Sequence, residues 1–242
     1  MASAPVDPNE AHAAAVADAK RLMRLARTGA LATLDAKAGA PLTTLIGVAS
    51  DFDGAPLFLM STLSRHTRNL AHDPCASLLL TGAHERGDPL NRPRVTLSGR
   101  VEQTAAPRAK VRYLQRNPKA QLYAGFADFA FYRLRIDDVH FNGGFGRASP
   151  LTVAEVLAPG DGEAALAEAE ERLLAEANAL GGAQLSRLTG HNALRLAWRA
   201  IGLDAEGLDL AAGGRAARAQ FAAPAHDPGA WRTHLKQLLA AG

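Results

Sequence analysis

Short apolar runs recur through the first 146 residues and are separated by glycine, aspartate and proline. The runs lie at 30–35, 41–50, 55–62, 75–82, 94–104 and 129–146. Runs of this length and spacing favour the strands of an antiparallel sheet or barrel over alternating strands and helices. The pattern therefore predicts an antiparallel β-structure for this part of the chain.

Helical signals flank and interrupt these runs. A helix is predicted over 7–29, because Asp7 can cap it, Pro8 fits its first position, Glu10 completes a capping-box-like pattern and Gly29 can end it. Two shorter helical segments, 64–74 and 107–118, are predicted between strands.

The composition and periodicity of the sequence change near residue 152, where alanine-rich segments with helical periodicity begin. This part predicts a helix over 151–182, a second over 188–204, a strand over 217–224 and a last helix that starts at Asp227 and Pro228. We therefore expect two domains, at 1–151 and 152–242, and the fold class α+β.

Composition narrows the class of protein. Of the 242 residues 48% are hydrophobic, which suits soluble domains with a core, and no apolar run reaches the ~18 residues of a membrane span. The N-terminal segment has no basic stretch followed by an apolar one, so we expect a cytoplasmic protein without a secretory signal. The single cysteine, Cys75, excludes an internal disulfide and is expected to be buried.

The formal net charge is +3, but arginines gather between residues 61 and 100. They are interspersed with strand-like runs, and aromatic residues are scarce among them. A nucleic-acid surface interleaves basic and aromatic residues, so this pattern favours a small anionic ligand over nucleic acid. We expect neither nucleic acid nor a membrane as a partner.

The strongest chemical signal is the helix start "SRHTR", in which Ser64 is a good N-cap. Arg65, His66 and Arg68 fill the first turn, where free N–H groups favour negative charge. Two interpretations follow. A bound phosphate would resolve the crowding of positive charge. Alternatively, the side chains point into solvent or pair with nearby acids, for which the candidates are Asp73, Glu85 and Asp88.

The order of several motifs resembles the FMN-binding split barrels related to pyridoxamine 5′-phosphate oxidase. The segment "PLFLMSTLSRHTRNLAHDPCASLLL" is followed by "RPRVTLSGRVEQT" and "YLQRNP", and the resemblance covers roughly residues 20–150. It implies a six-stranded antiparallel, Greek-key-like split β-barrel followed by a small α+β C-terminal domain. It also implies a homodimer that builds each cofactor site from both subunits.

A narrower resemblance links "HTRNL", "YRLRIDDVHFNGGFGRA" and the added domain to the haem-utilisation branch of these barrels, some members of which bind and degrade haem. The "GGFG" stretch follows a strand, and no GK[ST] motif follows it. A nucleotide loop is therefore not predicted, and Gly143, Gly144 and Gly146 are expected to allow a bulge or a close backbone approach.

Candidate site residues follow from the helix start and from the resemblance. The resemblance implies that Arg65 binds phosphate, that His66 replaces a lysine, and that Arg94 replaces a flavin-contacting glutamine. The cofactor-binding candidates are Thr43, Thr44, Ser61, Ser64, Arg65, His66, Arg68 and Arg94. The candidates for haem or for the partner's site are His140, Arg147 and His191. No metal site and no catalytic acid or base is predicted.

These features predict an FMN-binding flavoprotein, an oxidoreductase acting on an unknown small substrate. Two alternatives stay open. One is a haem-binding or haem-degrading protein on the same barrel, and the other is a flavin-binding module without catalysis. The cofactor carries the redox chemistry, so the sequence does not identify the substrate.

Overall fold

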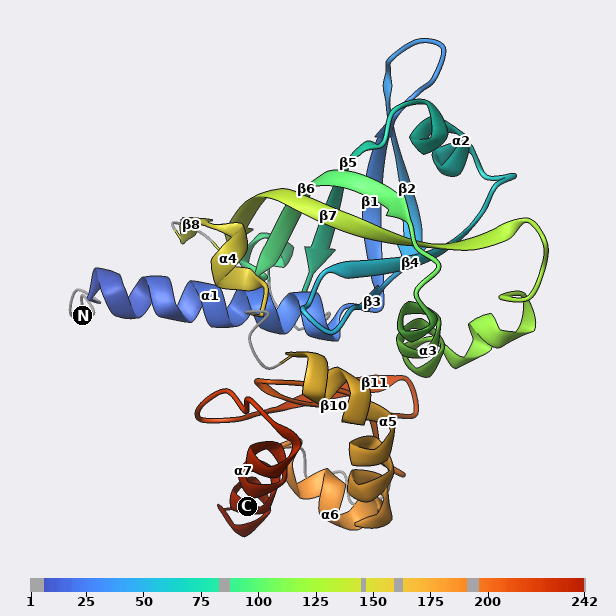
Figure 1. Ribbon diagram of the computed structural model, residues 1–242. Helices are drawn as coiled ribbons and strands as arrows, with labels where there is room; N and C mark the ends of the chain where they lie inside the picture. The colour runs from blue at the N-terminus through green and yellow to red at the C-terminus, as the bar shows by residue number, and fades with distance from the viewer. Residues whose placement is uncertain (1–6, 83–87, 145–146, 159–162, 191–195, 242) are drawn as a thin grey trace.

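The computed structural model describes residues 7–82, 88–144, 147–158, 163–190 and 196–241 of the chain. An antiparallel sheet curls around one hydrophobic core, and a smaller sheet with its helices encloses another (Figure 1). The predicted α+β class, a split barrel followed by a C-terminal α+β part, is confirmed.

The barrel sheet contains eight described strands, in the order β2-β1-β5-β6-β7-β4-β3, with β8 paired to β7. Six long strands correspond to the six predicted runs, and the short β3 and β8 extend them. The bounds are β1 Thr28–Leu34, β2 Pro41–Gly47, β3 Ala49–Ser50, β4 Pro56–Ser61, β5 Cys75–Thr81, β6 Arg94–Gln103, β7 Phe129–Asn142 and β8 Ala148–Leu151. Cys75 is exposed at the start of β5, so the expectation that it is buried was wrong.

The N-terminal helix α1 (Pro8–Leu25) packs one apolar face into the barrel core. Ala15, Ala19 and Leu22 recur at helical spacing on that face. Asp7 caps the helix as predicted and accepts a hydrogen bond from the Asn9 amide at 2.9 Å.

The predicted end of this helix at Gly29 was wrong. The helix ends at Leu25, and Gly29 lies in β1. A Cβ atom there would stand 2.7 Å from Leu78 Cδ1, so the glycine serves close packing between β1 and β5.

Two helices and two short 3₁₀ segments connect the strands. They are α2 Arg65–His72, η1 Pro89–Asn91, α3 Pro107–Arg116 and η2 Pro118–Leu122. Both helices lie within the predicted segments 64–74 and 107–118.

The C-terminal part contains α4 Val153–Val156, α5 Glu163–Ala179, α6 Gly182–Arg187, β9 Arg199–Asp204, β10 Gly207–Ala212, β11 Arg215–Gln220 and α7 Pro228–Ala241. Its sheet has the order β11-β10-β9 and is antiparallel. Asp227 caps α7, since its side chain accepts hydrogen bonds from the amides of Gly229 and Ala230. The predicted start of the last helix is therefore confirmed.

The second predicted helix, 188–204, was wrong over 199–204, which form β9, while residues 191–195 lie outside the described part. All of β9 after Arg199 is buried. A continuously buried apolar run lacks the two-residue alternation that distinguishes a strand. Periodicity therefore did not distinguish a strand from a helix here. The predicted strand 217–224 begins and ends earlier, as β11.

The two hydrophobic cores do not divide at one residue. Val156 of α4 belongs to the barrel core, and Phe52, which precedes β4, belongs to the C-terminal core. The division of the chain at 151/152 stays a prediction.

A network of buried charges joins α1 to the C-terminal sheet, which lies beneath that helix in Figure 1. Arg24 of α1 lies 3.2 Å from Asp204 of β9. Arg218 of β11 donates to Asp204 at 2.7 Å and to Asp209 at 2.9 Å. Arg24 also donates to the Asp51 carbonyl at 2.8 Å. These side chains fix the barrel and the smaller sheet to each other.

A second buried arginine makes a similar connection from α3. Arg112 pairs with Glu170 of α5 and donates to the carbonyl oxygens of Ser50 at 2.9 Å and Leu203 at 3.0 Å. The barrel helix α3 is thereby attached both to the barrel and to the C-terminal part.

Candidate functional site

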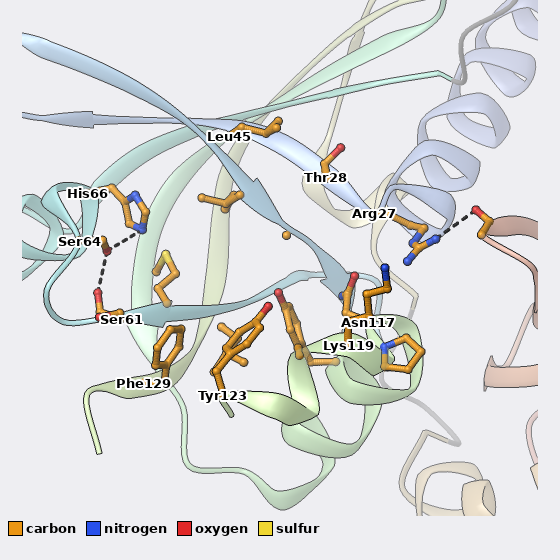
Figure 2. A pocket seen from close by; sticks show the side chains of 18 of the residues that line it. Arg27, Thr28, Leu45, Ser61, Ser64, His66, Asn117, Lys119, Tyr123 and Phe129 are labelled. Carbon is orange, nitrogen blue, oxygen red and sulfur yellow. Dashed lines mark hydrogen bonds between the residues drawn. The ribbon is translucent and has the colours of Figure 1, made fainter. Parts of the chain in front are cut away.

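A cleft of about 1080 Å³ lies between β2 and β4, the region where the barrel sheet stays open. We call it the barrel cleft. The C-terminal half of α3 and the following η2 form one wall (Figure 2), and the turn between β10 and β11 reaches the rim of the cleft. Its described lining residues include no aspartate or glutamate.

Tyr113 of α3 forms part of the wall between the two open strands. A Cβ atom on Gly47, at the end of β2, would stand 2.5 Å from the Tyr113 hydroxyl oxygen, so the glycine makes room for the phenol. Burial raises the pKa of Tyr113 to about 12, and the phenol stays protonated at neutral pH. Asn117 donates to the Val48 carbonyl at 3.1 Å and holds the segment after α3 against the barrel.

At the other end of the cleft His66 forms hydrogen bonds through both ring nitrogens. Nδ1 lies 3.1 Å from Thr44 Oγ1, and Nε2 lies 2.9 Å from Ser64 Oγ. Ser64 Oγ donates its proton to the Ser61 carbonyl at 2.7 Å, so Nε2 donates to Ser64. In the neutral ring, Nδ1 then accepts from Thr44. Burial lowers the pKa of His66, which favours this neutral imidazole.

Arg65 does not point into the cleft. It donates to Asp35 Oδ2 from Nη2 at 2.7 Å and from Nε at 3.2 Å. The acid with which it pairs is therefore in the β1–β2 turn and is neither Asp73 nor Asp88, whereas Glu85 lies outside the described residues. Because Arg65 is paired, burial favours the neutral form of His66 and Arg68 is exposed to solvent, the helix start does not require a bound phosphate to offset its charge.

We expect Arg65→Gln to raise the pKa of Asp35 towards its usual range. The Arg65 hydrogen bond is the largest cause that lowers this pKa to about 2, ahead of the Ala38 and Lys37 amides. Carboxyl-carbon NMR titration measures the shift, and Arg68→Gln is the matched control on the same helix. An Asp35 pKa that stays near 2 in Arg65→Gln would show that the two side chains are not paired.

The predicted cofactor residues separate into two groups. Ser61, Ser64 and His66 line the cleft, and Thr44 contacts His66. Thr43, Arg65 and Arg68 are exposed and are not lining residues.

The remaining candidates lie at the other end of the long β6 and β7 strands. Arg94 donates to the Leu90 carbonyl at 2.8 Å, and His140 is exposed on β7. Arg147 donates to the Gly143 carbonyl. None of these three lines the barrel cleft, and His191 lies outside the described residues.

The "GGFG" stretch behaves as predicted at Gly144, which has φ +120°, and a Cβ there would lie 2.8 Å from the Asn91 carbonyl oxygen. Gly143 is buried at the end of β7, and Gly146 lies outside the described residues.

Several residues that line the cleft were not predicted from the sequence. They are Arg27 before β1, Lys119 and Tyr123 after α3, Phe129 at the start of β7 and the Gly213–Gly214 turn. The turn alone had a local signal. Both glycines have positive φ, +52° and +86°, as a two-residue hairpin of the type I′ class requires.

Comparison with known proteins identifies the fold family. The family described as "CREG, beta-barrel" matches residues 8–157, more than half of the chain. The chain belongs to the CREG β-barrel family.

Solved structures resemble this CREG β-barrel protein over its whole length. A protein of unknown function from Agrobacterium tumefaciens is 32% identical, with a TM-score of 0.83 and complete coverage of both chains. A heme binding protein from Mycobacterium smegmatis is 25% identical, with a TM-score of 0.56, and covers 99% of this chain and 98% of its own.

One curated relative is an enzyme by name. The chloroplastic non-canonical heme oxygenase HOZ of Arabidopsis thaliana is 35% identical over 124 residues, which make up 50% of this chain. The match spans only 37% of that relative's length.

No helix in the described part of the chain is long and apolar enough to span a membrane. The predicted cytoplasmic location is not confirmed, since the curated relative is chloroplastic by name. The resemblance to a barrel family with haem-handling members is confirmed, whereas binding of FMN stays a prediction.

Proposed function

We propose that this CREG β-barrel protein binds haem in the barrel cleft. The observation that supports this most strongly is the lining of the cleft, which combines apolar walls, an imidazole at one end and cations at the other (Figure 2). The haem-related names of two relatives point in the same direction.

The walls suit a flat apolar ring system. Ile46 and Met60 come from the two open strands, and Tyr123 and Phe129 form an aromatic pair with ring centroids 5.0 Å apart. Small-molecule sites are mostly apolar with a few polar groups that fix orientation. The volume of about 1080 Å³ lies just above the roughly 300–1,000 Å³ usual for such sites.

Arg27 and Lys119 lie at the end of the cleft away from His66 (Figure 2). Both are exposed, so they can pair with carboxylates at the rim while the ring system is buried. Arg27 is oriented by its hydrogen bond to the Gly214 carbonyl at 3.1 Å. These two residues would hold the propionates.

His66 is the histidine among the described lining residues, and its neutral imidazole is the form that binds iron. It would have to exchange one of its hydrogen bonds, to Thr44 or to Ser64, for the metal. Bound haem would supply a redox-active iron, and the chain would orient it and limit its contact with water.

FMN is the competing ligand. The phosphate-binding role proposed for Arg65 has less support, because that side chain pairs with Asp35. The homodimer with a shared site also stays a proposal. It is supported by Leu45, which lines the cleft and is 76% exposed, and by Leu122, which is 80% exposed.

We expect haemin to bind with a shifted Soret band and Arg27→Gln/Lys119→Gln to weaken binding about tenfold. Each exposed ion pair contributes roughly 0.2–1 kcal/mol to binding. Loss of both pairs can therefore cost about 1.4 kcal/mol, which corresponds to a factor of ten in affinity. Absorbance titration measures haemin, and flavin fluorescence measures FMN in parallel. The control Arg172→Gln/Lys236→Gln alters cations on α5 and α7. Binding of FMN without haemin would contradict the proposal.

Haem degradation is the enzymatic candidate, because the chain is 35% identical to a heme oxygenase over half of its length. The test supplies the haemin-loaded protein with a reductant and O₂. Degradation removes the Soret band and releases a linear tetrapyrrole, whereas a binding protein keeps the band.

A further inference from the structure

A second cavity, of about 160 Å³, lies where the barrel meets the C-terminal sheet. We call it the arginine cavity, because Arg27, Arg116, Arg199 and Arg215 line it. Its described lining residues include no acidic side chain. It adjoins the barrel cleft, since Arg27 and the Gly213–Gly214 turn belong to both.

Arg116, the last residue of α3, is the buried member of this set, with 7% of its surface exposed. Its Nη2 donates to the Leu25 carbonyl at the end of α1. Its Nε and Nη1 are buried and have no hydrogen-bond partner. The other buried arginines, Arg24, Arg112 and Arg218, each pair with a carboxylate, whereas no carboxylate of the described residues pairs with Arg116.

An arginine stays charged in a protein, so burying it without a hydrogen-bonded counter-charge is costly. The charge of Asp209 acts on Arg116, but no ion pair joins them, and burial outweighs Asp209 and lowers the pKa of Arg116. The bond to Leu25 explains one donor group, and the two that remain need acceptors. Gln115, beside Arg116, also has a buried amide oxygen without a partner. Turning that amide over would present its NH₂ group as a further donor.

We propose that the arginine cavity binds an oxyanion, a phosphate or a carboxylate, which accepts a hydrogen bond from the unpartnered N–H groups of Arg116. Arg199 and Arg215, both exposed, add positive charge at the mouth. A water molecule takes about 30 Å³ of liquid volume, so about 160 Å³ has room for one such anion and water. This site does not depend on haem binding.

Thermal unfolding in sodium phosphate, compared with sodium chloride at equal ionic strength, tests the site. Phosphate at about five times its Kd should raise the Tm of the native protein by roughly 2–4 °C. Arg116→Met should abolish this rise, because the buried donor is lost. The control Arg172→Gln, on α5, should keep it.

A purely structural Arg116 gives a different result. Arg116→Met would then lower the Tm equally in phosphate and in chloride, and the native protein would show no phosphate effect, which would overturn the proposal. If Arg116→Met does not fold, Arg199→Gln/Arg215→Gln takes its place. That variant should reduce the phosphate-dependent rise while it keeps the Tm measured in chloride.

A haemin titration with and without phosphate distinguishes two sources of the anion, a carboxylate of the cleft ligand and free phosphate. If a carboxylate of the cleft ligand enters the arginine cavity, phosphate should raise the apparent Kd of haemin in the native protein but not in Arg116→Met. If free phosphate binds independently, it should raise the Tm and leave the haemin Kd unchanged. Failure of haemin to bind would contradict the haem proposal alone, because the phosphate arm needs no haemin.

Discussion

Asp204→Asn is expected to destabilise the fold by about 3–5 kcal/mol, the usual cost of breaking a buried ion pair from one side. Asp204 is fully buried and contacts both Arg24 and Arg218. The amide removes the negative charge, and the two buried guanidinium groups are left with Asp209, which pairs with Arg218 and acts on Arg24 through its charge. Urea unfolding measures the change in free energy.

Asp137→Asn is the matched control, because Asp137 is exposed and lies 3.4 Å from the exposed Arg135. That change should cost less than about 1 kcal/mol. A cost for Asp204→Asn that is no larger than the control's would show that the buried network does not stabilise the junction.

The same network makes the fold sensitive to acid. Burial opposes ionisation of Asp204, but Arg218 and Arg24 outweigh it and hold the pKa of Asp204 well below its usual range. A carboxylate with a lowered native pKa stabilises the fold above its unfolded pKa of about 3.9, and this contribution is lost as the pH falls further. The difference in stability between native protein and Asp204→Asn should therefore narrow below about pH 4.

His66→Ala is expected to weaken haemin binding about 10- to 100-fold and to change the Soret and charge-transfer bands. Losses of this size follow even from removing the groups that support a metal ligand, so loss of the ligand itself should be at least as large. Absorbance titration gives both the affinity and the spectrum. Added imidazole should restore the native spectrum by replacing the missing side chain in the cleft.

His72→Ala, at the exposed end of the same helix, should leave the spectrum unchanged. His140→Ala tests the ligand suggested by the sequence on β7. If His140→Ala loses the native spectrum and His66→Ala retains it, the iron is not held in the barrel cleft.

The sequence predicted the barrel well because its strands are bounded by local signals. The run 94–104 became β6, Arg94–Gln103, since Pro93 precedes it and Pro107 follows it at the start of the next helix. Strand β10 escaped prediction and β11 was predicted only from residue 217 on, because alanine favours helices and here pairing between the strands overrides that preference. The Gly213–Gly214 hairpin signal between them was present in the sequence.

The site was predictable where its residues are neighbours along the chain. Ser61, Ser64 and His66 surround one helix start, so a local motif indicated them together. Arg27 and Lys119 come from opposite ends of the barrel sequence and meet only in the folded chain. The pairing of Arg65, the predicted phosphate ligand, with Asp35 could not be predicted either, because these two residues also meet only in the folded chain.

The most direct test of haem binding in the barrel cleft is anomalous scattering at the iron edge from crystals of the haemin-loaded protein. The proposal expects one iron peak inside the cleft, beside His66 and between the walls that carry Ile46 and Tyr123. An iron peak beside His140 or His191, or no iron peak in haemin-loaded crystals, would contradict it.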